Sequence, residues 1–178
     1  NDHRLFDGML HHSKTLTDRR LDTNEAQAVE LPDGNVLLFA KSPFNETGCI
    51  AVAISRDGGK SFDSTLRFDL ALHSTDSLSV ISCGCKVDGY EALIYAGGSC
   101  NGAVKIGILH GENPQAIEWR YSRLVKPGTF GHCSLSMISE DTVGLFYESS
   151  GGLDMSFLRM DIPFLMAEDL PLHPVELE

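Results

Sequence analysis

Short runs that are either apolar or alternate between apolar and polar residues recur along most of the chain. They cover residues 25–31, 35–40, 49–55, 77–82, 91–97, 103–109, 118–124, 133–138, 142–148 and 154–162. An alternation of this kind is typical of half-buried β-strands. Asp-Gly and Gly-Gly turn signals separate many of the runs, and we find no stretch with sustained helical spacing. The sequence therefore predicts an all-β protein.

So many short strands are typical of a sandwich, a barrel or a propeller. The stretch SRDGGKSF, residues 55–62, favours the propeller because it fits the Asp-box pattern S-x-D-x-G-x-[S/T]-[W/F]. In that reading Ser55 opens a hairpin, Asp57 bonds to the turn backbone, Gly59 adopts a left-handed conformation and Phe62 packs beneath. The alternative is an ordinary Asp-Gly-Gly hairpin.

The length then limits the number of blades. A four-stranded blade takes about 40–50 residues, and propellers have about four to eight blades. The 178 residues of this chain are enough for between three and four. We therefore expect residues 1–167 to be propeller blades and part of a larger ring, completed by a second chain. Residues 168–178, which are acidic and contain two prolines, are expected to form a surface tail.

Composition and charge exclude several classes of protein. The net charge of −11 argues against binding to nucleic acid. No apolar run approaches the roughly 18–20 residues of a transmembrane helix, so no transmembrane segment is expected. The N-terminus does not have the form of a signal peptide. Motifs for phosphate binding and common hydrolases are missing from the sequence, and we expect no cofactor.

Five cysteines and one sequon indicate a secreted protein or one in the lysosomal lumen. Asn45, in Asn45-Glu46-Thr47, is the predicted glycosylation site. The spacing of Cys83 and Cys85 is CxC, which differs from the CxxC of zinc sites, so no metal site is expected. The sequence does not determine which of the five cysteines pair in disulfides: Cys49, Cys83, Cys85, Cys100 and Cys133.

Two further stretches flank the Asp-box and resemble the C-terminal half of the non-viral sialidases. Residues 23–38 look like the N-E-x-Q-x-V-E-L-x-D-G-x-[V/L]-L-L segment of that family. Residues 144–148, GLFYE, look like its G-L-[L/F]-Y-E strand. The matches keep their order from about residue 22 to residue 162. The resemblance implies part of a six-bladed sialidase-like propeller, with sialylated glycans as candidate ligands.

The resemblance also implies a particular site. Sialidases use a tyrosine nucleophile, which a neighbouring glutamate deprotonates, and three arginines that hold the substrate carboxylate. Glu25 falls on the glutamate, and it is either a retained site residue or simply an acid in a wet cavity. Lys41 and Ser99 align with two of the three arginines of the family. Lys41 could pair with an anionic ligand or be an ordinary solvated lysine, and Asn101 lies close to Ser99 as a further candidate for ligand binding.

His132 stands at the position of the tyrosine, in the stretch His132-Cys133-Ser134-Leu135. It is either a substitute nucleophile or acid/base group, or the occupant of a decayed site. A dyad of His132 with Cys133 is unexpected because neighbouring side chains on a strand point to opposite faces. Cys133 is expected between sheets or in a disulfide, and Trp119 in the core. The family's general acid and remaining arginine belong to its N-terminal half.

Two functional hypotheses follow. In the first, the chain is a non-catalytic propeller component that binds glycans or proteins in a secreted complex. In the alternative, it is part of an exo-α-sialidase that cleaves terminal sialic acids. A purely structural interaction module is a third and weaker hypothesis.

Overall fold

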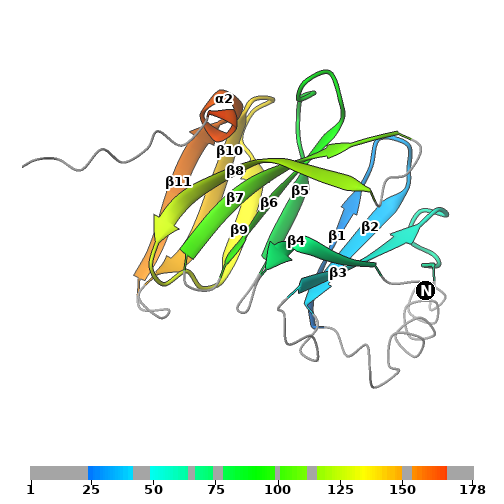
Figure 1. The fold of residues 1–178 in the computed structure, drawn as a ribbon, viewed down its shortest axis with the longest axis horizontal. Helices are drawn as coiled ribbons and strands as arrows, with labels where there is room; N and C mark the ends of the chain where they lie inside the picture. The colour runs from blue at the N-terminus through cyan, green and yellow to red at the C-terminus, as the bar shows by residue number, and fades with distance from the viewer. Residues whose placement is uncertain are drawn as a thin grey trace, which may run out of the picture.

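The computed structural model describes residues 24–41, 49–63, 67–73, 78–98, 101–111, 116–149 and 154–167. These residues form three antiparallel sheets and a short helix (Figure 1). None of the helices in the described part of the chain has the length and apolar character needed to cross a membrane. The all-β prediction is therefore confirmed.

Each sheet is a meander whose strands follow one another in chain order. The first contains β1 (Asn24–Glu30), β2 (Val36–Lys41), β3 (Cys49–Ser55) and β4 (Arg67–His73). The second contains β5 (Leu78–Ser82), β6 (Ala92–Gly98), β7 (Asn101–Leu109) and β8 (Ile117–Pro127). The third contains β9 (Cys133–Met137), β10 (Thr142–Ser149) and β11 (Asp154–Asp161), and helix α2 (Ile162–Met166) follows it.

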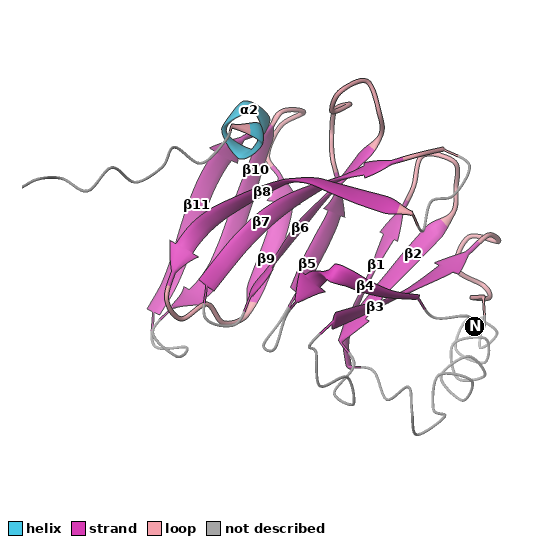
Figure 2. Ribbon diagram, in the orientation of Figure 1, coloured by secondary structure: helices cyan, strands magenta, loops and turns pink. Residues whose placement is uncertain are grey.

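The three sheets lie side by side like the blades of a propeller (Figure 2). The first strands of the sheets are neighbours, because β5 contacts both β1 and β9. Each sheet then extends outward from its first strand through antiparallel pairing to the next strand. Repetition of four-stranded sheets around an axis is the propeller architecture. The described residues thus form a partial propeller.

Two hydrophobic cores fill the spaces between the sheets, and β6 contributes to both. Leu93 and Tyr95 of β6 pack in the core against the first sheet, whereas Ile94 and Ala96 pack in the core against the third. All four are at most 1% exposed. A strand covered on both faces needs apolar residues at consecutive positions. This burial explains why β6 reads as an almost continuous apolar run. Trp119, expected in the core, packs partly buried against Tyr95 with ring centroids 5.8 Å apart.

The sequence analysis missed one strand and one helix. Residues 67–73 form β4, and the alternation of Phe68, Leu70 and Leu72 was the signal that could have found it. The last predicted strand ran to residue 162, but β11 ends at Asp161 and α2 begins at Ile162. The Asp161 carboxylate accepts a hydrogen bond from the backbone N–H of Phe164 at 2.7 Å, as an N-cap residue does. A helix of five residues is too short to show a periodicity.

The turn after β3 has a dense set of hydrogen bonds. The Asp57 carboxylate accepts the backbone N–H of Ser61 at 2.8 Å and its hydroxyl at 2.6 Å. The Ser55 hydroxyl oxygen accepts the backbone N–H of Gly59, which has a φ of 85°. The two bonds from Ser61 above all, together with a bond from the Ser55 hydroxyl to the Asp57 carboxylate, hold the pKa of Asp57 well below its usual range. The half-buried Phe62 follows. Assignment of this turn as an Asp-box stays a prediction.

Candidate functional site

The chain topology brings Glu25, Lys41, Asn101 and His132 to one rim of the sheets. Glu25 lies at the start of β1, and Lys41, at the end of β2, pairs with Asn24. β5 and β7 both pair antiparallel with β6, so these two strands run in the same direction. Asn101, the first residue of β7, therefore lies at the rim where β5 starts. His132 directly precedes β9. We call the ends of the sheets that carry these residues the site rim; they lie at the bottom in Figure 1.

Glu25 and Lys41 form an ion pair at this rim. The Lys41 Nζ lies 2.8 Å from the Glu25 Oε2, with 14% of the lysine side chain and 39% of the glutamate side chain exposed. The pairing of β1 with β2 is irregular between Asn24 and Gln27, and Glu25 has a left-handed φ of 49°. An irregularity of this kind redirects a side chain. The structure therefore brings together two residues that the sequence singled out separately.

The side-chain oxygen of Asn101 has a structural partner. It accepts the backbone N–H of Gly128 at 3.0 Å and so attaches the β8–β9 connection to the start of β7. Gly128 has a φ of 79°, a conformation that glycine adopts without strain. The predicted role of Asn101 in ligand binding stays a prediction. Ser99, Asn45 (the predicted glycosylation site) and residues 168–178 lie outside the described residues.

His132 is exposed and sits in an irregular pairing between β9 and β10. Gly131 donates its N–H to the Glu148 carbonyl, and Glu148 donates its N–H to the His132 carbonyl, both at 2.9 Å. Two residues thus oppose one, as in a β-bulge. The next residue, Cys133, is partly buried, and its thiol donates to the Ala96 carbonyl at 3.6 Å. The His132 and Cys133 side chains therefore have different surroundings, one solvent and the other core.

Glu148 is a candidate that the sequence analysis did not single out. Its backbone is the partner of His132, and its side chain lies beside Gly131, where an added Cβ would be 3.1 Å from the Glu148 Oε2. The position of Glu148 in the GLFYE stretch, close to His132 in the sequence, was the available signal. It adds an acid next to the histidine at the site rim.

The arginines whose side chains the structure describes lie away from these residues. Arg56 follows β3 at the opposite ends of the sheets, 3.8 Å from Asp63. Arg123, on β8, donates to the Ala167 carbonyl and stacks over the Phe164 ring at 4.2 Å. Arg159 pairs with Gly144 at the end of β11, and Arg120 belongs to a cluster described next. In the described part of the chain, the cation that lies beside Glu25 is therefore Lys41.

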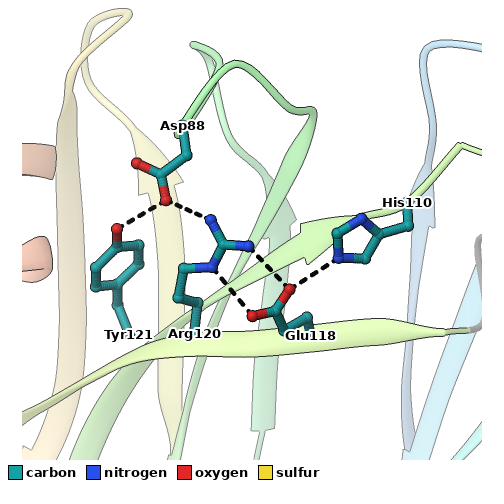
Figure 3. Close-up of polar contacts among 5 residues, drawn as sticks. All are labelled: Asp88, His110, Glu118, Arg120 and Tyr121. Carbon is teal, nitrogen blue, oxygen red and sulfur yellow. Dashed lines mark hydrogen bonds and ion pairs between the residues drawn. The ribbon is translucent and has the colours of Figure 1, made fainter.

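A polar cluster lies at the opposite rim (Figure 3). The Arg120 guanidinium bridges Asp88, at 2.6 Å, and Glu118, at 2.9 Å and 3.1 Å. The Tyr121 hydroxyl donates to Asp88, and the His110 ring lies 2.8 Å from Glu118. The bonds to Arg120 and His110 lower the pKa of Glu118 to about 2. This cluster connects strand β8 to the turn that holds Asp88, so its role is structural.

No group of three or more histidine, cysteine, aspartate or glutamate side chains within the described residues could hold a metal ion. Lys41, Glu25, Glu148 and His132 give the site rim an ammonium group, two carboxylates and an imidazole. These groups can form hydrogen bonds and ion pairs with a polar, anionic ligand.

Comparisons with known proteins identify the relatives of this chain. A scan against models of protein families finds no match. The anhydrosialidase of Macrobdella decora is 34% identical over an alignment of 142 residues, and this alignment covers 71% of this chain and 18% of that protein. A sialidase of Bacteroides fragilis is 33% identical over 74% of this chain and 25% of its own length.

Solved structures agree with this relationship. The intramolecular trans-sialidase of the leech is 26% identical with a TM-score of 0.69, over 80% of this chain and 24% of that one. The trans-sialidase of Ruminococcus gnavus has the same fold, with a TM-score of 0.70 at 24% identity over 81% of this chain and 34% of that one. The partial propeller with this rim is therefore a sialidase-type propeller, and the chain belongs to the sialidase family. It spans about a fifth to a third of the length of these relatives.

Proposed function

We propose that this chain is part of a sialidase-family propeller that binds sialylated glycans at the site rim without cleaving them. The observation that carries the proposal is the Glu25–Lys41 ion pair. In the family, the glutamate removes the proton of a tyrosine nucleophile. Here the carboxylate is paired with a lysine, and an exposed imidazole takes the position of the tyrosine.

The same residues suit recognition of a carboxylated sugar. The Lys41 ammonium supplies a positive charge for a sugar carboxylate, although it lacks the planar, bidentate fork of arginine. His132 and Glu148 can donate to and accept from the sugar hydroxyl groups. Because a single lysine makes fewer directed bonds than an arginine cluster, we expect weak binding that depends on salt.

Hydrolysis of terminal sialic acids is the second candidate function. It is favoured by the names of the curated relatives, which are sialidases, and by the retained Glu25. In this alternative His132 acts as nucleophile or acid/base group, with Glu148 as a neighbouring carboxylate. A working site would also need arginines from outside the described residues.

The propeller is proposed to continue beyond the third sheet. One face of that sheet packs in the core, and the other exposes Phe146 and Phe157, which are directly paired and 45% and 59% exposed. Met155, two residues from Phe157 on the same strand, is 53% exposed. Contiguous exposed aromatic groups indicate a contact surface. We infer that a further blade covers this face, and the sequence analysis predicts that a second chain supplies it.

The sequon at Asn45 supports a secreted or lysosomal protein. Treatment of the purified natural protein with a peptide N-glycosidase should reduce its mass and convert Asn45 to aspartate. An unmodified Asn45 in that protein would count against this localisation.

Two assays on the complete protein distinguish the candidate functions. Binding to sialylated glycans on an array should be lost in Glu25→Ala and kept in Glu30→Ala, a control that removes an exposed acid at the other end of β1. Release of the fluorophore from a 2-O-aryl sialoside should not exceed the rate in buffer. Enzymatic release would overturn the non-catalytic proposal, and an array without any binding would overturn the glycan proposal.

A further inference from the structure

Cys83 and Cys85 form a dithiol at the turn that follows β5. The two Sγ atoms lie 3.9 Å apart. Cys83 continues the β5–β6 pairing, since its N–H donates to the Ala92 carbonyl at 2.8 Å. Residues two apart on an extended chain point to the same face, and a bend at Gly84 and Cys85 brings these two side chains closer together. We propose that the pair is a redox site in which Cys83 and Cys85 close reversibly to an intramolecular disulfide.

Gly84 lets the bend approach the β9–β10 connection closely. A Cβ built on Gly84 would lie 2.8 Å from the Glu140 carbonyl oxygen and 3.3 Å from the end of the Met137 side chain. The contact with a backbone oxygen leaves no room for a larger residue. The turn therefore packs closely against the β9–β10 connection, which holds the two thiols in place. Closure of the disulfide must shorten the distance between the two Sγ atoms from 3.9 Å to about 2 Å.

The two thiols differ in their surroundings, and this difference sets the order of the reaction. Cys83 is 8% exposed and belongs to the core between the second and third sheets, whereas Cys85 is half-buried at its edge. Burial above all, together with the neighbouring Cys85, raises the pKa of Cys83 to about 11. Cys85 is thus the thiol that meets a reagent from solution, and Cys83 is the thiol that resolves the product.

Oxidised glutathione is a suitable oxidant. The Cys85 thiolate attacks one sulfur of the glutathione disulfide, and the first glutathione leaves as a thiolate that takes up a proton. Cys83 then loses its proton and attacks the Cys85 Sγ, and the second glutathione leaves in the same way. The protein loses two electrons and two protons, and one glutathione disulfide becomes two glutathione thiols. Because Cys83 must be deprotonated, this second step should become faster as the pH rises.

Peptide mapping of the complete protein tests the proposal. After equilibration with oxidised glutathione, remaining thiols are blocked with N-ethylmaleimide and the protein is digested with trypsin. Both cysteines fall in the peptide of residues 68–86, and the other three fall in separate peptides, residues 42–56, 87–105 and 124–159. Peptide 68–86 should lose two hydrogen atoms and carry no maleimide, and a dithiol reductant before blocking should restore two labels.

Two variants sharpen the result. Cys85→Ser should leave Cys83 open to maleimide after unfolding, with no closed peptide. Cys133→Ser, which alters a partly buried cysteine of the same core, should close as the wild type does. Two maleimide labels on peptide 68–86 after oxidation would overturn the proposal. So would a glutathione adduct that persists at high pH, or a link from this peptide to one of the other three.

Discussion

The Lys41 ammonium group lies 2.8 Å from the Glu25 carboxylate and connects the end of β2 to the irregular start of β1. The pair places opposite charges at the position where relatives of this chain are expected to bring a glutamate close to a tyrosine nucleophile. It also determines how substitutions at either residue should behave.

We predict a small energetic coupling between these two residues. In a double-mutant cycle of Glu25→Gln and Lys41→Met, the coupling in the free energy of unfolding should be below about 1 kcal/mol, because partly exposed ion pairs are screened by water. Urea denaturation of the complete protein measures it, and high salt should reduce it. A coupling of several kcal/mol would show that the pair is much better shielded than its exposure indicates.

Replacing His132 by tyrosine should not by itself create a sialidase. The resemblance predicts that Lys41 and Ser99 take the positions of two arginines, and a tyrosine nucleophile would then still lack most of the clamp for the substrate carboxylate. Hydrolysis of an aryl sialoside by His132→Tyr should stay at background. The combination with Lys41→Arg and Ser99→Arg should raise the rate above that of His132→Tyr. Activity in the single variant would mean that the clamp is complete without these two positions.

Gly102→Ala should destabilise the protein by about 1–3 kcal/mol, as overpacking of a core does. A Cβ at Gly102 would lie 2.1 Å from the ring of Phe130, which is fully buried and stacks on Tyr147. The matched control is Gly111→Ala, where a Cβ meets no atom within 4 Å. Thermal and urea unfolding should separate the two variants. Equal stability would show that the Phe130 ring can move aside.

Acid should remove the contribution of Asp57 to stability. The pKa of this carboxyl is lowered from its ordinary value of 3.8 by its bonds to Ser61 and Ser55. A lowered folded-state pKa stabilises the protein above pH 3.8 and loses that effect as the pH falls through the folded-state value. The difference in stability between wild type and Asp57→Ala should therefore be constant near neutral pH and shrink below 3.8. Denaturation at several pH values tests this, with Asp63→Ala as a nearby control.

Arg120→Met should loosen the turn that holds Asp88. The guanidinium links that turn to β8 beside a second bond from the Tyr121 hydroxyl to Asp88. Within the turn, Val87 and Tyr90 exchange backbone hydrogen bonds at 2.9 Å and 3.0 Å. Amide exchange at Val87 and Tyr90 should become several-fold faster, because local opening costs less free energy. Arg56→Met, which changes an exposed arginine elsewhere, should leave both rates unchanged. An unchanged rate in Arg120→Met would show that the backbone bonds and the bond from Tyr121 to Asp88 are sufficient to order the turn.

Local patterns in the sequence were sufficient for most of the fold. The alternation of apolar residues predicted nearly every strand, because one side chain in two must face a core. Asp88-Gly89 marked a tight turn, and both residues do have positive φ angles. The strand β4 was overlooked although its alternation is visible. Helix α2 could not be recognised from the sequence because its five residues are too few to show a periodic pattern. Its formation depends instead on the Asp161 cap.

The sequence by itself determined the all-β class, the family resemblance and the residues of the candidate site other than Glu148. Only the tertiary structure decided how those residues meet. The pairing of Glu25 with Lys41, the bond from Gly128 to Asn101 and the position of Glu148 beside His132 all join separate strands. Such contacts depend on strand register and on β-bulges, and one extra residue in a strand changes both. The local periodicity of the sequence does not encode these contacts.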